Sequence, residues 1–581
     1  MPIPMLLSLI ALISYVIGCK SEIYCNDEFL ETLQLSGIFQ DSKTFVDMPT
    51  KRPTSLVLTE YERIIKKGPS MNEIKKFIND NFQFTGFDIV YQTIEEWNPE
   101  IKLLPKLSPQ LRIFVSDIHS RWKRLYRKFD SSVLCNGCES SALDLPHPFI
   151  IPGGRFREFY YWDSYWISKG LLVSELVNTT KNVLLNLSFL INQYGYVPNG
   201  SRVYYLTRSQ PPYFTKMVNQ YFDHTKDFGF LEMIVSSVEI EYEFWMTERV
   251  TEIRVENGDL YKLNFYNAET DSPRPESYKE DVNLNPSSSR DLFSNILSAT
   301  ESGWDFSSRW MRDSRLSSLD TRNIIPVDLN ALMYENELLI SKFYTILGNP
   351  KKAAVFESRA LSRKKHFNEV FWQYSTSSWK DYNRHNLQFY LSDLSPLWSG
   401  IEPPIETSKI LKKHETFLTN FYGIPISSIS TEQQWDFPNA WAPYQFELSN
   451  YLFNVSHLMS LKVAQNFLDT AWCGWNATGY FFEKYDVTES GKMGTGGEYK
   501  VQEGFGWTNG VLLSLINLFG NELSIPTACN SLEQNYSDVL QSVQRWNLIL
   551  MASLVLTAFS IGCRLNHFLK PQFKSTVSRS S

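Results

Sequence analysis

The sequence predicts an all-α protein in which pairs of helices pack around one core. Between Pro326 and Gly348, apolar residues recur at i, i+3 and i+4 spacing, and Asp328 stands where a helix N-cap belongs. A second amphipathic stretch covers residues 353–371, and the Gly-Asn-Pro turn before it predicts an antiparallel helical hairpin. Strand-like and helix-like segments do not alternate, so a parallel α/β fold is disfavoured.

The composition supports one large folded body and narrows its function. Of the 581 residues, 43% are hydrophobic, which is enough for a large core. Lys and Arg number 56 against 63 Asp and Glu, and the net charge of −7 argues against nucleic-acid binding through a positive field. The 8 His residues are scattered and no H-E-x-x-H motif occurs, so we expect neither a metal nor another cofactor. Further helical stretches are predicted at residues 165–177, 183–193, 231–245 and 444–467.

The N-terminus has the pattern of a secretory signal peptide. An apolar run from Met5 to Ile17 has the length of a signal-peptide core and is short for a membrane span. We expect residues 1–20 to form the signal peptide, with cleavage between Gly18 and Ser21. The alternative is a buried N-terminal helix.

The C-terminus has the pattern of a membrane anchor. Residues 546–563 carry no charge and are long enough to cross a bilayer, and the tail 564–581 is basic. Under the positive-inside rule the tail is cytoplasmic, which predicts a type I single-pass protein of the plasma membrane or secretory-pathway membranes. The body of the chain at 21–545 is then extracellular or lumenal. A lipid-anchor signal would place its apolar stretch at the very end of the chain, and an amphipathic packing helix is the other alternative.

Cysteines and glycosylation sequons fit an exported protein. The Cys135-Asn-Gly-Cys138 motif lacks the second pair that a zinc site needs, so a local disulfide is favoured over redox catalysis. With Cys19 removed and Cys563 in the anchor, five cysteines remain, so at least one is unpaired or bridges another chain. N-linked glycans are expected at Asn178, Asn186, Asn454, Asn476 and Asn535.

The segment at residues 152–165, PGGRFREFYYWDSY, gathers groups that suit a polyol ligand. Arg155, Glu158, Trp162 and Asp163 combine planar donors, carboxylate acceptors and aromatic faces. A structural salt-bridge cluster under a loop explains the same residues equally well.

Two long motifs resemble the signatures of the trehalase family. They are PGGRFREFYYWDSY at 152–165 and QWDFPNAWAP at 434–443, and further matches in chain order extend the resemblance over residues 50–520. The resemblance implies an (α/α)6 barrel that cleaves the disaccharide α,α-trehalose to two glucoses with inversion at one anomeric carbon.

The same resemblance implies the roles of the site residues. It makes Asp305 the general acid and Glu483 the general base. Asp305 lies between Trp304 and Phe306, where burial can raise its pKa. Trp162 and Trp435 are expected to offer apolar plates to sugar rings. The implied substrate-binding residues are Arg155, Trp162, Asp163, Asn199, Arg208, Arg274, Glu276, Gly303, Trp435 and Glu498.

A glycine-rich segment at 491–498 is expected to close over the bound sugar as a lid. Its Gly-Lys pair is followed by Met493, so it does not match a phosphate-binding P-loop. Two alternatives to trehalose hydrolysis stay open: another inverting α-glucosidase on the same barrel, and an inactive sugar-binding receptor.

Overall fold

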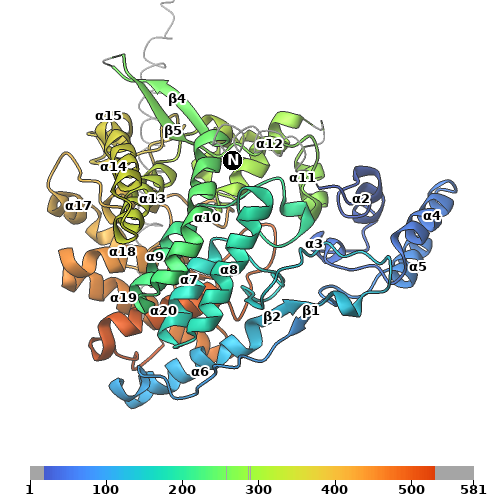
Figure 1. Cartoon of the computed structure of the whole chain (residues 1–581), viewed down its shortest axis with the longest axis horizontal. Helices are drawn as coiled ribbons and strands as arrows, with labels where there is room; N and C mark the ends of the chain where they lie inside the picture. The colour runs from blue at the N-terminus through green and yellow to red at the C-terminus, as the bar shows by residue number, and fades with distance from the viewer. Residues whose placement is uncertain (1–18, 257, 286, 288, 530–581) are drawn as a thin grey trace, which may run out of the picture. The chain divides into compact units, whose positions relative to one another are not determined.

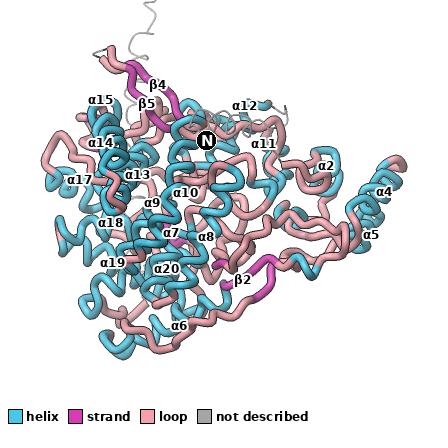
Figure 2. The backbone as a smooth tube through the Cα atoms, viewed as in Figure 1, coloured by secondary structure: helices cyan, strands magenta, loops and turns pink. Residues whose placement is uncertain are grey.

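The computed structural model describes residues 19–256, 258–285, 287 and 289–529. In this part of the chain helices dominate and strands are few and short, as the apolar periodicity predicts (Figure 1 and Figure 2). Residues 1–18 of the predicted signal peptide, the predicted anchor at 546–563 and the basic tail lie outside the described residues. No helix within the described part is long and apolar enough to cross a membrane.

Six helices of the described part contact one another in a closed ring. In order around the ring they are α7 (Asp163–Val173), α9 (Phe214–Thr225), α13 (Val327–Ile346), α16 (Ser395–Trp398), α18 (Ala442–Val455) and α20 (Gly506–Phe519). Helices α7 and α20 are buried on almost every side. A helix that is enclosed all round belongs to the interior of a protein, so these two form the innermost part of the core.

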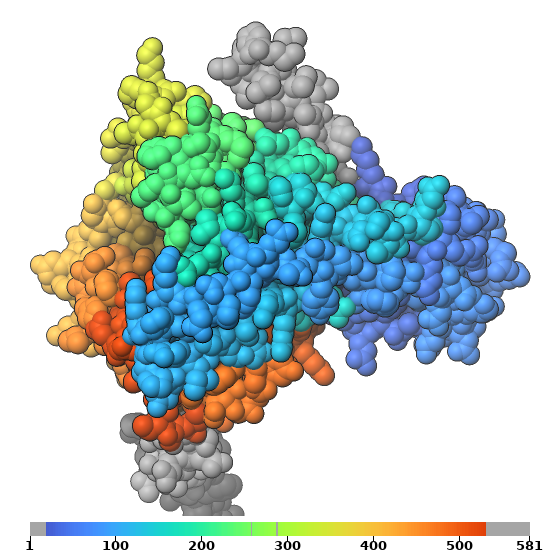
Figure 3. Space-filling model, turned by 60° about the horizontal axis from the view of Figure 1, so that its bottom comes forward, coloured from blue at the N-terminus to red at the C-terminus, as the bar shows by residue number. Residues whose placement is uncertain are grey.

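A second set of helices packs outside the ring. These are α6 (Pro109–Leu125), α8 (Val177–Tyr194), α10 (Phe228–Thr247), α14 (Pro350–Lys365), α17 (Thr407–Thr419) and α19 (His457–Thr478). Helix α6 packs on α20, and α14 packs on α13. Helix α8 packs on both α7 and α9, and α10 packs on both α9 and α13. Helix α19 packs on α18, and α17 packs on α19. In Figure 3 the blue region that includes α6 lies against the orange and red C-terminal part of this assembly.

The hairpin predicted between residues 326 and 371 is confirmed as α13 and α14, with different ends. Asn349 caps α14 by accepting a hydrogen bond from a backbone N–H of its first turn. Asp328 lies inside the first turn of α13 rather than at its N-cap, which is Pro326, and its carboxylate binds the Arg309 guanidinium at 2.7 Å. The second stretch breaks after Lys365 and finishes as a separate short helix, α15 (Phe367–Phe371).

The ring closes where α7 and α20 meet through glycine. A Cβ atom at Gly170 would lie 2.4 Å from the Gly510 Cα, and a Cβ at Gly510 would lie 2.1 Å from the Trp166 carbonyl oxygen. Any larger residue at either position would separate the two backbones. Glycine is therefore needed at both positions for this close approach.

Residues 19–87 form what we call the N-terminal cap. It contains α2 (Asp27–Gln34), α3 (Lys43–Val46), α4 (Thr54–Ile65) and α5 (Met71–Asn81), and in Figure 1 α2, α4 and α5 lie to one side of the ring helices. The cap has its own apolar cluster, in which the rings of Phe45 and Phe82 lie 5.1 Å apart. Tyr160 and Tyr205, from the body of the chain, belong to the same cluster. The cap is thus joined to the body by shared aromatic packing.

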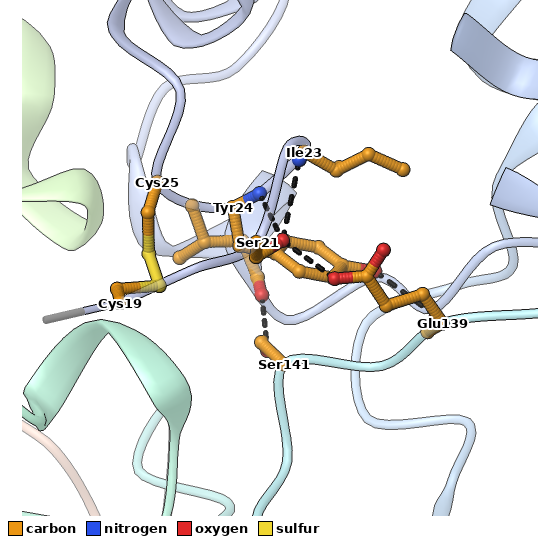
Figure 4. The surroundings of a disulfide bond; sticks show 8 residues. Cys19, Ser21, Ile23, Tyr24, Cys25, Glu139 and Ser141 are labelled. Atoms are coloured by element: carbon orange, nitrogen blue, oxygen red, sulfur yellow. Dashed lines mark hydrogen bonds between the residues drawn. A yellow bond between two sulfur atoms is a disulfide. The ribbon is translucent and has the colours of Figure 1, made fainter. Parts of the chain in front are cut away.

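The start of the cap is held by a disulfide and a serine (Figure 4). Cys19 pairs with Cys25, and Ser21 Oγ donates to Glu139 at 2.6 Å while accepting from the Tyr24 N–H at 2.9 Å. The Tyr24 hydroxyl donates to the Met48 carbonyl at 2.8 Å. These contacts tie the first described residues to the loop that follows the CxxC motif.

The disulfides correct one prediction and confirm another. The CxxC motif forms the expected local disulfide, Cys135–Cys138. The expectation of an unpaired cysteine depended on setting Cys19 aside, and it is wrong for the described residues because Cys19 is bonded to Cys25. Cys473 and Cys529 are disulfide-bonded as well.

The predicted glycan acceptors fall into three groups. Asn178, Asn454 and Asn476 are exposed, and Asn535 lies outside the described residues. The prediction for Asn186 is wrong in this fold, because its side chain is 0% exposed and bonds the backbone of His147 through both amide atoms, at 2.9 and 3.0 Å. A glycan has no room at a buried amide that is already paired.

Short helices and small sheets fill the connections. The remaining α-helices are α11 (Tyr278–Leu284) and α12 (Arg290–Glu301). The strands are β1 (Ile89–Tyr91), β2 (Tyr126–Phe129), β3 (Phe149–Ile150), β4 (Val250–Arg254), β5 (Leu260–Asn264), β6 (Trp372–Gln373), β7 (Ser378–Trp379), β8 (Asn439–Trp441) and β9 (Lys484–Asp486). They form one antiparallel sheet of order β1-β2-β3 and the antiparallel pairs β4-β5, β6-β7 and β8-β9.

Candidate active site

One cavity brings together all twelve residues for which the family resemblance implies a catalytic or binding role. Its lining includes Arg155, Trp162, Asp163, Asn199, Arg208, Arg274, Glu276, Gly303, Asp305, Trp435, Glu483 and Glu498. These residues come from loops, from one short 3-10 helix (Pro275–Ser277) and from the first residue of α7, so the helical ring serves as the scaffold on which these connections meet. The segments lie far apart in the chain, and only the fold brings them together.

Asp305 lies in the loop after α12, beside the cavity. Burial raises its pKa to about 7; the Arg274 guanidinium opposes the rise and the Glu498 carboxylate adds to it. Gly303 shapes this loop, since its φ is +77° and a Cβ there would lie 2.6 Å from the Trp162 ring. Asp305 is therefore a carboxyl group that can hold a proton near neutral pH.

Glu483 lies immediately before β9, with its side chain 2% exposed. The Tyr499 hydroxyl donates a hydrogen bond to its Oε1 at 2.8 Å, and the Gln502 N–H donates to Oε2 at 3.4 Å. Burial raises the pKa of Glu483, while the Lys484 ammonium and the Tyr499 hydrogen bond oppose the rise. Two donors and a neighbouring cation thus favour the ionised carboxylate against its burial.

Asp163 is a third carboxyl group at the cavity, at the start of α7. Burial raises its pKa to about 8; a backbone hydrogen bond lowers it, while the charges of Glu483 and Asp305 raise it further. Asp163 is therefore protonated at neutral pH and can donate a hydrogen bond to a ligand oxygen.

Arg208 and Glu276 present unused hydrogen-bonding atoms to the cavity. Arg208 Nε donates to Asn199 Oδ1 at 2.7 Å, and its Nη2 donates to Glu276 Oε1 at 2.8 Å. Arg208 Nη1 and Glu276 Oε2 are buried and have no hydrogen-bond partner within the described residues. A buried donor and acceptor left without partners are expected to bind a ligand with hydroxyl groups. Burial raises the pKa of Glu276, but the two arginines Arg208 and Arg274 hold it below its usual value.

Arg274 connects the glycine-rich segment to the rest of the site. Its Nη2 donates to Asp281 Oδ1 at 2.6 Å and to Glu498 Oε1 at 2.8 Å. The predicted lid segment at 491–498 is thus bound to the cavity wall through its last residue. Opening and closing of this segment stays a prediction.

Arg155 is held by a residue that the sequence analysis missed. Asp41 of the N-terminal cap accepts two hydrogen bonds from its guanidinium, at 2.7 and 2.6 Å. The Tyr499 ring lies under the same guanidinium at 4.5 Å. Glu158 is absent from the cavity lining; it binds Lys43 at 2.5 Å and also contacts Arg202, so for this residue the structural alternative is correct.

The aromatic lining includes both indole rings that the sequence predicts as apolar plates. Trp435 is 1% exposed, and its ring is stacked on Trp441 at 4.0 Å and on Trp304 at 5.3 Å. Trp435 lines the cavity, but two other indole rings already stack on it, so its role as an apolar plate for a sugar stays a prediction. Trp162 also lines the cavity, where its ring lies next to Gly303, and its role as an apolar plate stays a prediction.

Several lining residues were not predicted, although most neighbour the predicted ones in the chain. Tyr160 lies within the first motif, Gln434 opens the second, and Tyr499 follows Glu498. The unpredicted lining residues are Pro152, Phe156, Tyr160, Tyr205, Gln210, Ser277, Thr300, Gln434, Trp441, Tyr499, Phe505 and Trp507. No cluster of three or more His, Cys, Asp or Glu side chains in the described part has the arrangement of a metal site.

The site has the means for acid–base chemistry on a polar ligand. One carboxyl group is held in an environment that favours its protonated form, and another receives donors that favour its ionised form. Arginine and amide groups supply hydrogen bonds, and indole rings form the apolar walls. Two carboxyl groups in contrasting environments are what the hydrolysis of a glycosidic bond requires.

Comparison with known proteins places the chain in a family. A model of the Trehalase family matches residues 37–520. The chain is 41% identical over 545 residues to a trehalase of Dictyostelium discoideum, covering 87% of this chain and 92% of that protein. It is also 41% identical over 529 residues to a trehalase of Homo sapiens, covering 87% of this chain and 91% of that protein.

A solved structure shares the fold. The neutral trehalase of Saccharomyces cerevisiae matches with a TM-score of 0.54 and 24% sequence identity, over 64% of this chain and 74% of that one. The family match covers most of the chain, and the two sequence relatives are aligned over nearly their whole length. The chain therefore belongs to the trehalase family.

Proposed function

We propose that this protein hydrolyses α,α-trehalose to two glucose molecules, with Asp305 as general acid and Glu483 as general base. The observation that carries the proposal is that both carboxyl groups line one cavity. Burial raises both pKa values, to about 7 for Asp305, and the Lys484 ammonium and the Tyr499 hydrogen bond oppose the rise at Glu483. Membership of the trehalase family supplies the substrate. A bond between two anomeric carbons needs a proton on the bridging oxygen and an activated water on the far side of one ring.

The reaction is a single displacement. Asp305 transfers its proton to the bridging oxygen as the bond from that oxygen to one anomeric carbon breaks, and the departing glucose keeps its α configuration. Glu483 accepts a proton from a water molecule, whose oxygen bonds to the same carbon from the opposite face and gives β-glucose. The acid ends ionised and the base protonated, so one proton exchange with solvent resets the site.

The arginines support the same step. Arg208 and Arg274 are buried at the cavity, and each is fixed by carboxylate or amide partners. Donors that are already oriented cost little reorganisation when charge shifts on the sugar in the oxocarbenium-like transition state. The unpartnered Arg208 Nη1 and Glu276 Oε2 are the atoms best placed to bind sugar hydroxyls.

We propose further that the ring helices α7, α9, α13, α16, α18 and α20, with the outer helices around them, form an (α/α)6 barrel. The cyclic order of the helix contacts and the fold shared with the yeast neutral trehalase support this assignment.

Proton NMR of the purified protein with trehalose tests the reaction. We expect α- and β-glucose to appear in equal initial amounts, before mutarotation mixes them. Release of α-glucose alone would contradict inversion, and no release would contradict the substrate. Maltose, offered in parallel, should be hydrolysed far more slowly.

We also propose that the catalytic body is exported and anchored by residues 546–563. The uncharged run, the basic tail and the exposed sequons at Asn178, Asn454 and Asn476 support this proposal. Digestion of the protein from secretory cells with an N-glycosidase should lower its apparent mass, and Asn186→Gln should leave that shift unchanged. An unglycosylated protein that is released from membranes by salt alone would contradict the proposal.

A further inference from the structure

The second motif, at residues 434–443, binds the loop that carries Asp305. The Trp435 N–H donates to the Phe306 carbonyl at 3.0 Å. The Asp436 carboxylate accepts from the Ser307 hydroxyl at 2.8 Å and from the Ser308 N–H at 2.9 Å. Three contacts from two consecutive residues therefore fix the backbone that follows the acid.

The same motif also binds the strand that follows Glu483. Residues Asn439–Trp441 form β8, which pairs antiparallel with β9, and Trp441 stands opposite Lys484. The pairing of β9 with β8 begins at Lys484, one residue after Glu483, and therefore fixes where Glu483 lies in the site. One short segment thus holds both carboxyl-bearing parts of the site.

The Gln434 side chain joins the two parts directly. Its Nε2 donates to the Asp305 carbonyl oxygen, and its Oε1 accepts from Lys484 Nζ at 2.6 Å. Gln434 is 1% exposed and Lys484 is 0% exposed, so water does not compete for these bonds. The amide NH2 group thus binds the loop that carries Asp305, and the amide oxygen binds the residue that follows Glu483.

Glycine makes room for this amide. A Cβ atom at Gly497 would lie 2.7 Å from Gln434 Oε1, and the φ of Gly497 is +92°, which other residues rarely adopt. The glycine-rich segment therefore encloses Gln434 against the two carboxyl-bearing parts and leaves its side chain little freedom to rotate.

We propose that Gln434 is a positioning residue, which fixes the acid and the base relative to each other by binding the Asp305 carbonyl and the Lys484 ammonium. The inference rests on the proposed function, because it concerns the same two carboxyl groups. General acid–base catalysis depends steeply on the placement of both groups, and a displacement of about 1 Å can reduce the rate 100-fold. In the proposed function, sugar binding is assigned mainly to other lining residues, such as Arg208 and Arg274.

Two variants test the proposal. Gln434→Met keeps the length of the side chain but loses both hydrogen bonds, and Gln434→Glu keeps an acceptor for Lys484 but loses the donor to Asp305. We expect kcat for trehalose to fall at least about tenfold in each, with KM changing less than about threefold. The melting temperature of each variant, measured in parallel, shows whether it folds.

Gln445→Met is the matched control. Gln445 is 0% exposed and also bridges backbone atoms, accepting from the Ile424 N–H at 2.8 Å and donating to the Ile424 carbonyl at 2.9 Å, but it is not part of the cavity lining. This control should lower the melting temperature with little change in kcat.

The outcomes separate the inference from the proposed function. Wild-type protein that fails to hydrolyse trehalose would overturn the proposed function. Active wild-type protein with an unchanged kcat in both Gln434 variants would overturn the positioning role alone. A loss of kcat matched by an equal loss in Gln445→Met would also overturn it, because the effect would then be general destabilisation.

Discussion

At the scale of single residues, burial raises the pKa of three carboxyl groups in the cavity, and each group has different neighbours that oppose the rise. Asp305 and Asp163 are buried with few donors, and their pKa values rise to about 7 and about 8. Glu483 has the Tyr499 hydroxyl and the Lys484 ammonium beside it, and both favour its ionised form. In the proposed reaction Asp305 is the group that holds its proton near neutral pH, and Glu483 is the group whose ionised form has an ammonium and a hydrogen-bond donor beside it.

Asp305→Asn and Glu483→Gln should separate these roles. We expect each to lower kcat for trehalose by roughly 10²–10⁴-fold, the usual contribution of a general acid or base. With α-glucosyl fluoride, whose fluoride leaves without needing a proton, Asp305→Asn should retain much more activity and Glu483→Gln should not. Steady-state kinetics on both substrates measure the difference.

An equal loss on both substrates in Asp305→Asn would contradict its role as the acid. The melting temperatures of both variants provide the control for folding, because neither substitution changes the size of the side chain.

The site residues that the sequence could predict are those within long motifs. Asp305 and Glu483 were both identified by resemblance, although the Glu-Lys pair at 483–484 alone looks like an ordinary surface pair. The contact of Asp41 with Arg155 and that of Gln434 with Asp305 join segments more than 100 residues apart, as the hydrogen-bond separations of 114 and 129 positions show. No local pattern marks such a pair. The stacking of Trp435 on Trp441 and Trp304 could not be predicted either, because it depends on tertiary packing.

At the scale of elements, the N-terminal cap is held to the body by buried charges. Lys43 of α3 binds Asp47 at 2.8 Å and Glu158 at 2.5 Å, with all three side chains at most 2% exposed. Arg202 is the other cation beside both carboxylates, at 3.5 Å from each. This cluster connects the segment that carries Asp41 to the first motif, and so connects the cap to Arg155.

Lys43→Met should strongly destabilise the protein. Removing Lys43 leaves the two buried carboxylates with Arg202 as their nearby cation, at a greater distance, and breaking a buried ion pair in this way costs about 3–5 kcal/mol. Chemical denaturation followed by tryptophan fluorescence measures the change. Lys76→Met is the control: Lys76 pairs with Asp80 at the surface, where its side chain is 76% exposed, and it should change stability little. Equal effects of the two substitutions would contradict the structural role of the buried cluster.

Helical elements could be predicted where one face is polar. The α13–α14 hairpin follows from its apolar spacing and from the turn at residues 348–350. The closure of the ring could not be predicted in this way, because α7 and α20 are enclosed on nearly every side and lack a polar face that would orient them. Their contact also joins parts of the chain that are far apart in sequence.

At the scale of the whole molecule, buried acids link folding stability to pH. Burial raises the pKa of Asp163 and Glu241 to about 8 and that of Asp305 to about 7. An acid whose pKa is higher in the folded state binds its proton more tightly there, so stability falls as pH rises through the interval up to the folded pKa. Buried histidines act oppositely: burial lowers the pKa of His414 to about 4, which adds stability as pH rises, but only up to about 6.5.

The melting temperature should therefore fall between about pH 6.5 and about pH 8, where only the acids contribute among these groups. Thermal unfolding at several pH values in this range measures the slope. Glu241→Gln should make the slope shallower, because it removes one of the acids with a raised pKa. Glu241 does not line the cavity, so the substitution leaves the site residues in place. A melting temperature that rises over this range would contradict the assignment.

The contact of Gly170 with Gly510 has a consequence for biosynthesis. Helix α7 leaves the ribosome more than 300 residues before α20 does, and the face of α7 that packs on α20 stays uncovered until α20 is made. The catalytic chamber can therefore be completed only after translation has passed residue 519. Until then, the nascent chain exposes the apolar face of α7 that packs on α20, and we expect a chaperone to bind it. A premature stop codon just before α20 should yield aggregates rather than a weakened enzyme.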